Sequence, residues 1–180
     1  MANTAHPLID IPRHQVDEDL LEALKRRVRG RVLVLGVGNE LRGDDAVGLA
    51  VVRALPPEVE ALECGEVPES YLDEVRRRAP DCLLIVDAMD FGARPGSVGM
   101  LALGGNNPRN RLSLDTHRPS LELLAEYVRA EMGAETVVVG IQPRTVEWGA
   151  AMSPEVRQAG QALARWLSDG LGRGSEMGRW

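Results

Sequence analysis

Apolar residues along this chain gather in five short runs, and the segments between most of these runs repeat an apolar residue every three or four positions. The runs have the length and the content of β-branched residues that are typical of buried strands. They predict strands at residues 31–35, 59–63, 82–87, 98–103 and 136–141. The first run stops at a glycine, Gly36, so the chain is expected to turn there.

The repeating segments predict helices at residues 46–55, 70–78, 120–132 and 154–171. Strands and helices therefore alternate, which favours an α/β fold with an open, mostly parallel five-stranded sheet and helices on both faces. In such a sheet the functional residues lie in loops at the carboxyl ends of the strands.

The two ends of the chain differ from its middle. Residues 1–30 are polar and contain two prolines, with a weak helical pattern at Leu20, Leu24 and Val28, so they are interpreted as an appended arm that is partly helical or disordered. Residues 31–170 form the predicted domain, and the glycine-rich residues 171–180 are expected to be a flexible tail.

Composition and charge narrow the class of protein. At 180 residues, with 44% hydrophobic and 27% charged residues, the chain is expected to form one globular domain. Its net charge of -6 argues against a nucleic-acid partner. Two cysteines, Cys64 and Cys82, are too few for a secreted disulfide framework. The absence of a signal-peptide pattern and of an apolar run of ~20 residues predicts a cytoplasmic protein without a membrane partner.

The loop after the first strand carries the candidate chemistry. A dinucleotide-binding fingerprint would need a third glycine where Leu41 stands, and no Gly-Lys-Ser/Thr follows for a phosphate loop. The next residues of interest are the acidic pair Asp44 and Asp45, which would repel an anion and suit a cation. From the residues alone two interpretations stay open, a metal-facing acid or a helix start in which Asp44 caps the helix and Asp45 complements its dipole.

Several segments, taken together, carry a resemblance to a known family. They are 32–55 (VLVLGVGNELRGDDAVGLAVVRAL), 67–70 (VPES), 83–92 (LLIVDAMDFG) with Pro95 and Gly96, 116–117 (TH) and 139–143 (VGIQP). In this order they resemble the nickel-hydrogenase maturation endopeptidases, most closely the branch that serves formate-hydrogenlyase and related hydrogenases. The family fold, a twisted five-stranded sheet between helices, agrees with the predicted strands.

The resemblance implies a reaction and a set of site residues. The family's metal-contacting positions correspond to Asp45, Asp87 and His117, and Asp45 or Asp87 would activate water. The nickel is expected to arrive on the partner, a nickel-loaded precursor of a hydrogenase large subunit, whose C-terminal extension is removed. No organic cofactor is expected, and the protein is expected to act as a monomer. Substrate recognition is assigned to four further motif residues: Gly38, Asn39, Gly65 and Gln142.

Two other functions are weighed against this one. A nickel-sensing chaperone would dock on the precursor without cutting it, and a nucleotide-binding domain is disfavoured by Leu41 and the acidic pair. No Ser-His-Asp order, HExxH helix or activated cysteine is visible, so the common protease classes are not supported. One segment departs from the family pattern, since residues 63–66 read Glu-Cys-Gly-Glu where many members have Asp-Gly-Gly or Asp-Cys-Gly.

Overall fold

All five predicted strands are present in the computed structural model of the protein, which describes residues 18–103 and 118–172. The strands are β1 (Val32–Val37), β2 (Ala61–Gly65), β3 (Cys82–Ala88), β4 (Val98–Leu103) and β5 (Glu135–Ile141). They form one sheet in the order β2-β1-β3-β5-β4. Strands β2, β1, β3 and β5 run parallel, and β4 pairs with β5 in the antiparallel sense. The prediction of a mostly parallel five-stranded sheet is confirmed.

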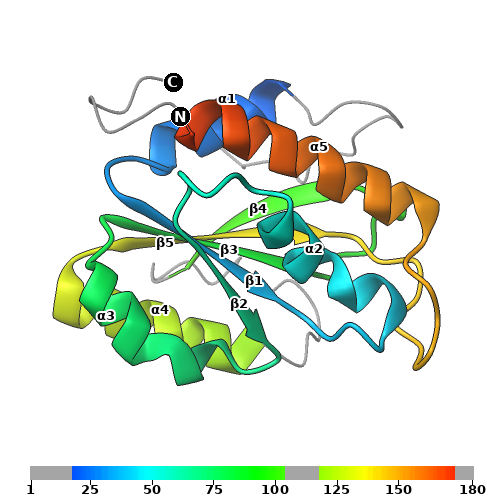
Figure 1. The fold of residues 1–180 in the computed structure, drawn as a ribbon, viewed down its shortest axis with the longest axis horizontal. Helices are drawn as coiled ribbons and strands as arrows, with labels where there is room; N and C mark the ends of the chain where they lie inside the picture. Colours follow the sequence, from blue (N-terminus) through cyan, green and yellow to red (C-terminus); the bar gives the residue numbers. More distant parts are fainter. Residues whose placement is uncertain (1–17, 104–117, 173–180) are drawn as a thin grey trace, which may run out of the picture.

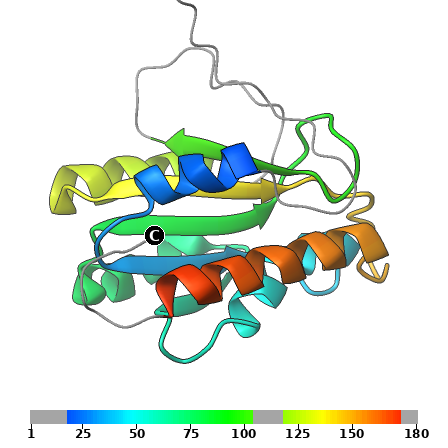
Figure 2. The same cartoon turned by 90° about the horizontal axis from the view of Figure 1, so that it is seen from above.

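Helices cover both faces of the sheet (Figure 1). The α-helices are α1 (Glu18–Arg27), α2 (Val47–Arg53), α3 (Leu72–Arg78), α4 (Arg118–Met132) and α5 (Pro154–Leu171). Two short 3-10 helices, η1 (Gly43–Ala46) and η2 (Pro68–Tyr71), lead into α2 and α3. Helices α1, α2 and α5 pack on one face, and α3 and α4 pack on the other. Figure 1 shows the sheet between these two layers, and Figure 2 looks onto the face that α1 and α5 cover.

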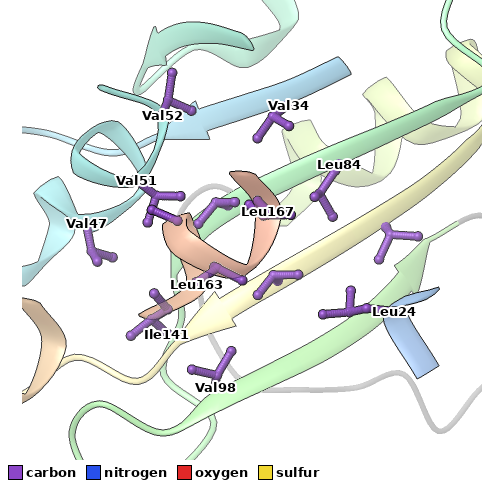
Figure 3. Close-up of a cluster of buried hydrophobic side chains, with 14 of the residues drawn as sticks. Leu24, Val34, Val47, Val51, Val52, Leu84, Val98, Ile141, Leu163 and Leu167 are labelled. Atoms are coloured by element: carbon purple, nitrogen blue, oxygen red, sulfur yellow. The ribbon is translucent and has the colours of Figure 1, made fainter. Parts of the chain in front are cut away.

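The hydrophobic core has two halves because successive side chains of a strand point to opposite faces. On β3, for example, Leu84 and Val86 pack toward α2 and α5, whereas Leu83 and Ile85 pack toward α3 and α4. All seven residues of β3 are buried. Figure 3 shows the first half, where Leu163 and Leu167 of α5 lie among side chains of α1, α2 and the sheet. The central strands are thus packed against helices on both faces.

Helix α1 belongs to the domain core. Its Leu20 and Leu24, together with Val28 just after the helix, are buried in the same cluster as α5 and the sheet. The weak helical pattern in the predicted arm therefore corresponds to a real helix whose apolar residues complete the core. The hydrophobic core therefore includes residues that precede residue 31, where the domain was predicted to begin.

The largest difference from the predicted strand limits is in β2, which begins at Ala61 instead of residue 59. Val59 is buried, as its apolar character suggests, but its backbone N–H donates to the Pro56 carbonyl in a turn. Pairing in register with β1 begins at Ala61, which lies opposite Val34, and the Glu60 carbonyl just before it accepts from Val34 N at 2.9 Å. None of the helices among the described residues is long and apolar enough to span a bilayer.

Candidate active site at the carboxyl edge of the sheet

Two glycines let the loop after β1 fold tightly back onto the strand ends. Gly38 has φ of +139°, and a Cβ there would overlap the carbonyl group of Asp45. A Cβ at Gly48, in the first turn of α2, would overlap the carbonyl oxygens of Val37 and Val86. Helix η1, which carries the acidic pair, consequently lies against β3. Gly36 completes the Gly-x-Gly pair, because a Cβ there would overlap the carbonyl oxygen of Gly48, so these glycines serve close packing of backbone on backbone.

Asp45 lies at the carboxyl edge of the sheet with 9% of its surface exposed. Its Oδ2 accepts a hydrogen bond from the backbone N–H of Asn39 at 2.8 Å. The Asn39 side chain fixes the same loop, because its Oδ1 accepts from Leu41 N at 2.8 Å and its Nδ2 donates to Glu66 Oε2 at 3.0 Å. The loops after β1 and β2 are thereby joined beside Asp45.

Asp87 lies near the end of β3 and is fully buried. Its Oδ1 accepts from the backbone N–H of Ala88 at 2.8 Å. Strand β3 is the direct neighbour of β1, with Val86 in register with Gly36, so Asp87 stands at the level where β1 turns toward Asp45. The structure brings the two carboxylates to the same edge, Asp87 from β3 and Asp45 from η1, which the loop after β1 leads into. Their catalytic and metal-contacting roles stay predictions.

His117, the third predicted metal contact, lies outside the described residues. Within residues 18–103 and 118–172, no three His, Cys, Asp or Glu side chains gather as a ligand set for a metal ion. Asp45 and Asp87 are two hard oxygen donors at most, too few to enclose a metal ion by themselves.

Gly65 and Gln142, two of the predicted recognition residues, have structural contacts at this edge. The Gly65 carbonyl accepts from Gly38 N at 2.9 Å, which ties the end of β2 to the loop after β1. Gln142 follows β5 and is 6% exposed. Its Oε1 accepts from Phe91 N at 2.9 Å and Ala93 N at 3.2 Å.

The amide nitrogen of Gln142 is also engaged within the chain. Its Nε2 donates to Asp90 Oδ1 at 3.1 Å and to the Pro143 carbonyl at 3.2 Å. All of these contacts lie in the loops that follow β3 and β5. Gln142 therefore joins the loops that follow β3 and β5. Its assignment to substrate recognition stays a prediction.

The prediction that Asp44 caps the helix is wrong. Neither η1 nor α2 has a side-chain capping hydrogen bond. Asp44 is fully buried, and its Oδ2 accepts from the backbone N–H groups of Arg144 at 2.7 Å and Thr145 at 3.1 Å. Its Oδ1 accepts from Ser153 N at 2.6 Å, and the Ser153 hydroxyl lies 2.8 Å from both oxygens.

Asp44 thus fastens the loop between β5 and α5 to η1, directly beside Asp45. Ser153 is a structural residue that the sequence did not single out. The Ser-Pro pair at 153–154 is a helix-start signal, and Ser153 does occupy the N-cap position of α5. Its hydroxyl donates to Asp44 instead of accepting a hydrogen bond from the first turn of α5. Local sequence does not predict this contact, because Asp44 is more than 100 positions away.

The two cysteines have no nucleophilic role in this arrangement. Both thiols are free and buried, and desolvation by burial raises the pKa of Cys64 and of Cys82 to about 12. A thiol attacks only as its thiolate, so neither sulfur is active near neutral pH. This agrees with the absence of an activated-cysteine motif in the sequence.

We expect native protein at pH 8 to react with neither thiol when it is treated with the disulfide reagent DTNB. At a pKa of about 12 both thiols are protonated at that pH and inaccessible. Unfolding in guanidinium should return both to an ordinary pKa and release two equivalents of product. Rapid stoichiometric reaction of the folded protein would contradict the buried placement of Cys64 and Cys82.

Comparisons with known proteins agree with this architecture. The family model for hydrogenase maturation protease matches residues 47–168. Hydrogenase 3 maturation protease of Escherichia coli K12 is 30% identical over 146 residues, which cover 79% of this chain and 92% of that protein.

Two solved structures have the same fold. The [NiFe] hydrogenase maturation protease HycI from Thermococcus kodakarensis superposes with a TM-score of 0.68 at 28% identity, over 82% of this chain and 97% of that chain. The hydrogenase maturating endopeptidase HybD from E. coli gives a TM-score of 0.63 at 28% identity, over 78% and 91% of the two chains.

Proposed function

The chain belongs to the hydrogenase maturation protease family, and from that premise we propose that it cleaves the C-terminal extension from the large-subunit precursor of a nickel-containing hydrogenase. It is a peptide hydrolase, as its relatives are. The observation that carries the proposal is the placement of Asp45, in η1 against the loop after β1, and of Asp87, near the end of the neighbouring strand β3, at one edge of the sheet.

The carboxylate pair supports a specific chemistry. A carboxylate at this edge accepts the proton of a water molecule as the water attacks the scissile carbonyl. The nickel belongs to the substrate, where it is bound by the precursor's own thiolates, and Asp45, Asp87 and His117 add ligands from the protease side. This makes cleavage conditional on metal loading, because only a loaded precursor presents an ion that the open carboxylate set attracts.

The decisive experiment incubates the protein with nickel-loaded and nickel-free large-subunit precursor and follows both by mass spectrometry. We expect one C-terminal peptide to be released from the loaded precursor and none from the nickel-free precursor. A stable, uncut complex with loaded precursor would favour the nickel-sensing chaperone. Equal cleavage of the two precursors would exclude the metal as a recognition element.

The setting of the reaction is part of the proposal. Cys64 and Cys82 are buried free thiols, which suits a reducing compartment, and we place the reaction in the cytoplasm. The expectation that the protein acts as a monomer, without an organic cofactor, stays a prediction.

A further inference from the structure

Exposed hydrophobic side chains gather at the edge that carries the two carboxylates. Five large hydrophobic residues are exposed in the described part of the chain, and four of them lie in loops that follow β1, β2 and β5. These four are Leu41 at 56%, Val67 at 47%, Val146 at 38% and Trp148 at 71%. Single exposed hydrophobic residues are common on protein surfaces, but their concentration at one edge indicates an interaction site.

Three of these residues come from two loops that are joined directly. The backbone N–H of Gly149 donates to the Leu41 carbonyl at 2.7 Å, and Arg42 Nε donates to the Val146 carbonyl at 3.2 Å. Figures 1 and 2 both show the loop after β1 and the loop before α5 at the same end of the sheet. We call Leu41, Val146 and Trp148 the apolar rim.

The loops that present the apolar rim are held in place. Thr145 O accepts from Asp44 N at 3.0 Å, in addition to the contacts of the Asp44 carboxylate. A Cβ at Gly43 would overlap the Thr145 carbonyl oxygen and crowd the side chain of Ala150, so this position lies directly against the loop before α5. A surface that is ordered before binding loses less conformational entropy when a partner docks. The rim is therefore built like a preformed recognition surface.

Trp148 is the strongest single indication. The chain has only three tryptophans, and aromatic residues make up 3% of it. Tryptophan is highly buried on average, and leaving its large apolar ring in water forgoes a stabilising contribution to folding. At protein–protein interfaces, tryptophan is one of the residue types on which binding free energy is concentrated.

We propose that the apolar rim is the docking surface for the hydrogenase large-subunit precursor. This inference rests on the proposed function, which requires a folded protein substrate to reach Asp45. The rim is continuous with that site: Leu41 donates its backbone N–H to the side chain of Asn39, whose own N–H binds Asp45. Docking on the apolar rim brings the precursor's C-terminal segment to the carboxylates. The rim residues themselves take no part in the reaction.

The test is a double variant, Leu41→Ser with Trp148→Ser, assayed on nickel-loaded precursor. We expect KM to rise roughly tenfold or more, since two central apolar contacts are lost, while kcat at saturating precursor stays within about a factor of two. The matched control is Leu123→Ser, an exposed leucine on α4 outside these loops, which should leave KM unchanged. Circular dichroism confirms folding of each variant.

Binding is also measured by itself, in an Asp45→Asn background where bound precursor stays uncut. A Kd weakened roughly tenfold by the rim substitutions supports the proposal, and an unchanged Kd overturns it. Because this measurement needs no cleavage, it tests docking on the apolar rim even if the wild-type protein fails to cut the precursor. Failure to cut would contradict the proposed function but not the docking surface.

Two other outcomes would also overturn the inference. Binding to anionic lipid vesicles that the rim substitutions abolish, with KM unchanged, would assign the surface to a membrane. A dimer of the protein that light scattering shows to dissociate in the double variant, again with KM unchanged, would assign it to self-association.

Discussion

Replacing Asp45 by Asn is expected to abolish cleavage of nickel-loaded precursor while the protein stays folded. The amide has the shape of the carboxylate, and its oxygen still accepts the hydrogen bond from Asn39 N. It lacks the negative charge that a general base or a metal ligand needs. Loss of a positioned general base alone lowers rates by roughly 10²–10⁴. The measurement is the initial rate of peptide release by mass spectrometry, with thermal denaturation as the check on folding.

The matched variant is Asp87→Asn, which keeps an oxygen for the Ala88 N–H at the end of β3. We expect the same loss of cleavage if both acids serve one reaction. Near-normal activity in Asp45→Asn with a complete loss in Asp87→Asn would leave Asp87 as the only acid that works in the site. Normal activity in both would remove the carboxylate edge from the mechanism.

The sheet was predictable from the sequence because its signals are local. Five apolar runs bounded by polar or glycine residues are enough to place strands in an α/β protein. Helix α5 matches its predicted limits at Pro154 and Leu171, since Val156, Leu163 and Leu167 recur along it at helical spacing and define its buried face.

The position of Asp45 and Asp87 at one edge of the sheet was also predictable, though only in part. Once the strands are known, the fold class places both residues at the carboxyl edge, and the adjacency of β1 and β3 confirms this placement. Which acid faces a substrate depends on side-chain contacts that no periodicity records. The resemblance to the family supplied that assignment, not the spacing of the residues.

The role of Asp44 lay beyond local signals. An Asp just before a helix is usually interpreted as an N-cap, because its side-chain oxygen commonly accepts from a backbone N–H of the first turn. Here the partners are Arg144, Thr145 and Ser153, about 100 residues later in the chain. Their approach requires β5 to lie in the sheet and α5 to return beside α2, so only the tertiary structure shows it.

Replacing Asp44 by Asn is therefore expected to destabilise the protein strongly, although Asp45→Asn is not. The buried carboxylate accepts from three backbone N–H groups and one hydroxyl, using both oxygens. An Asn keeps one oxygen and turns an NH₂ group toward backbone donors that then lack an acceptor. Weakened charge-assisted bonds and an unsatisfied buried donor together cost about 2–4 kcal/mol. For a domain of this size the melting temperature should fall by roughly 5–15 °C.

Two controls isolate the cause of that destabilisation. Asp73→Asn makes the same carboxylate-to-amide change at a side chain that is 90% exposed, so it should leave the melting temperature unchanged. Ser153→Ala removes the hydroxyl but keeps the backbone N–H donor to Asp44, so its cost should be smaller, about 1 kcal/mol. Thermal and urea denaturation followed by circular dichroism measure all three variants. An Asp44→Asn protein as stable as the wild type would show that the loop before α5 is held without this carboxylate, and the rigid support inferred for the apolar rim would be lost with it.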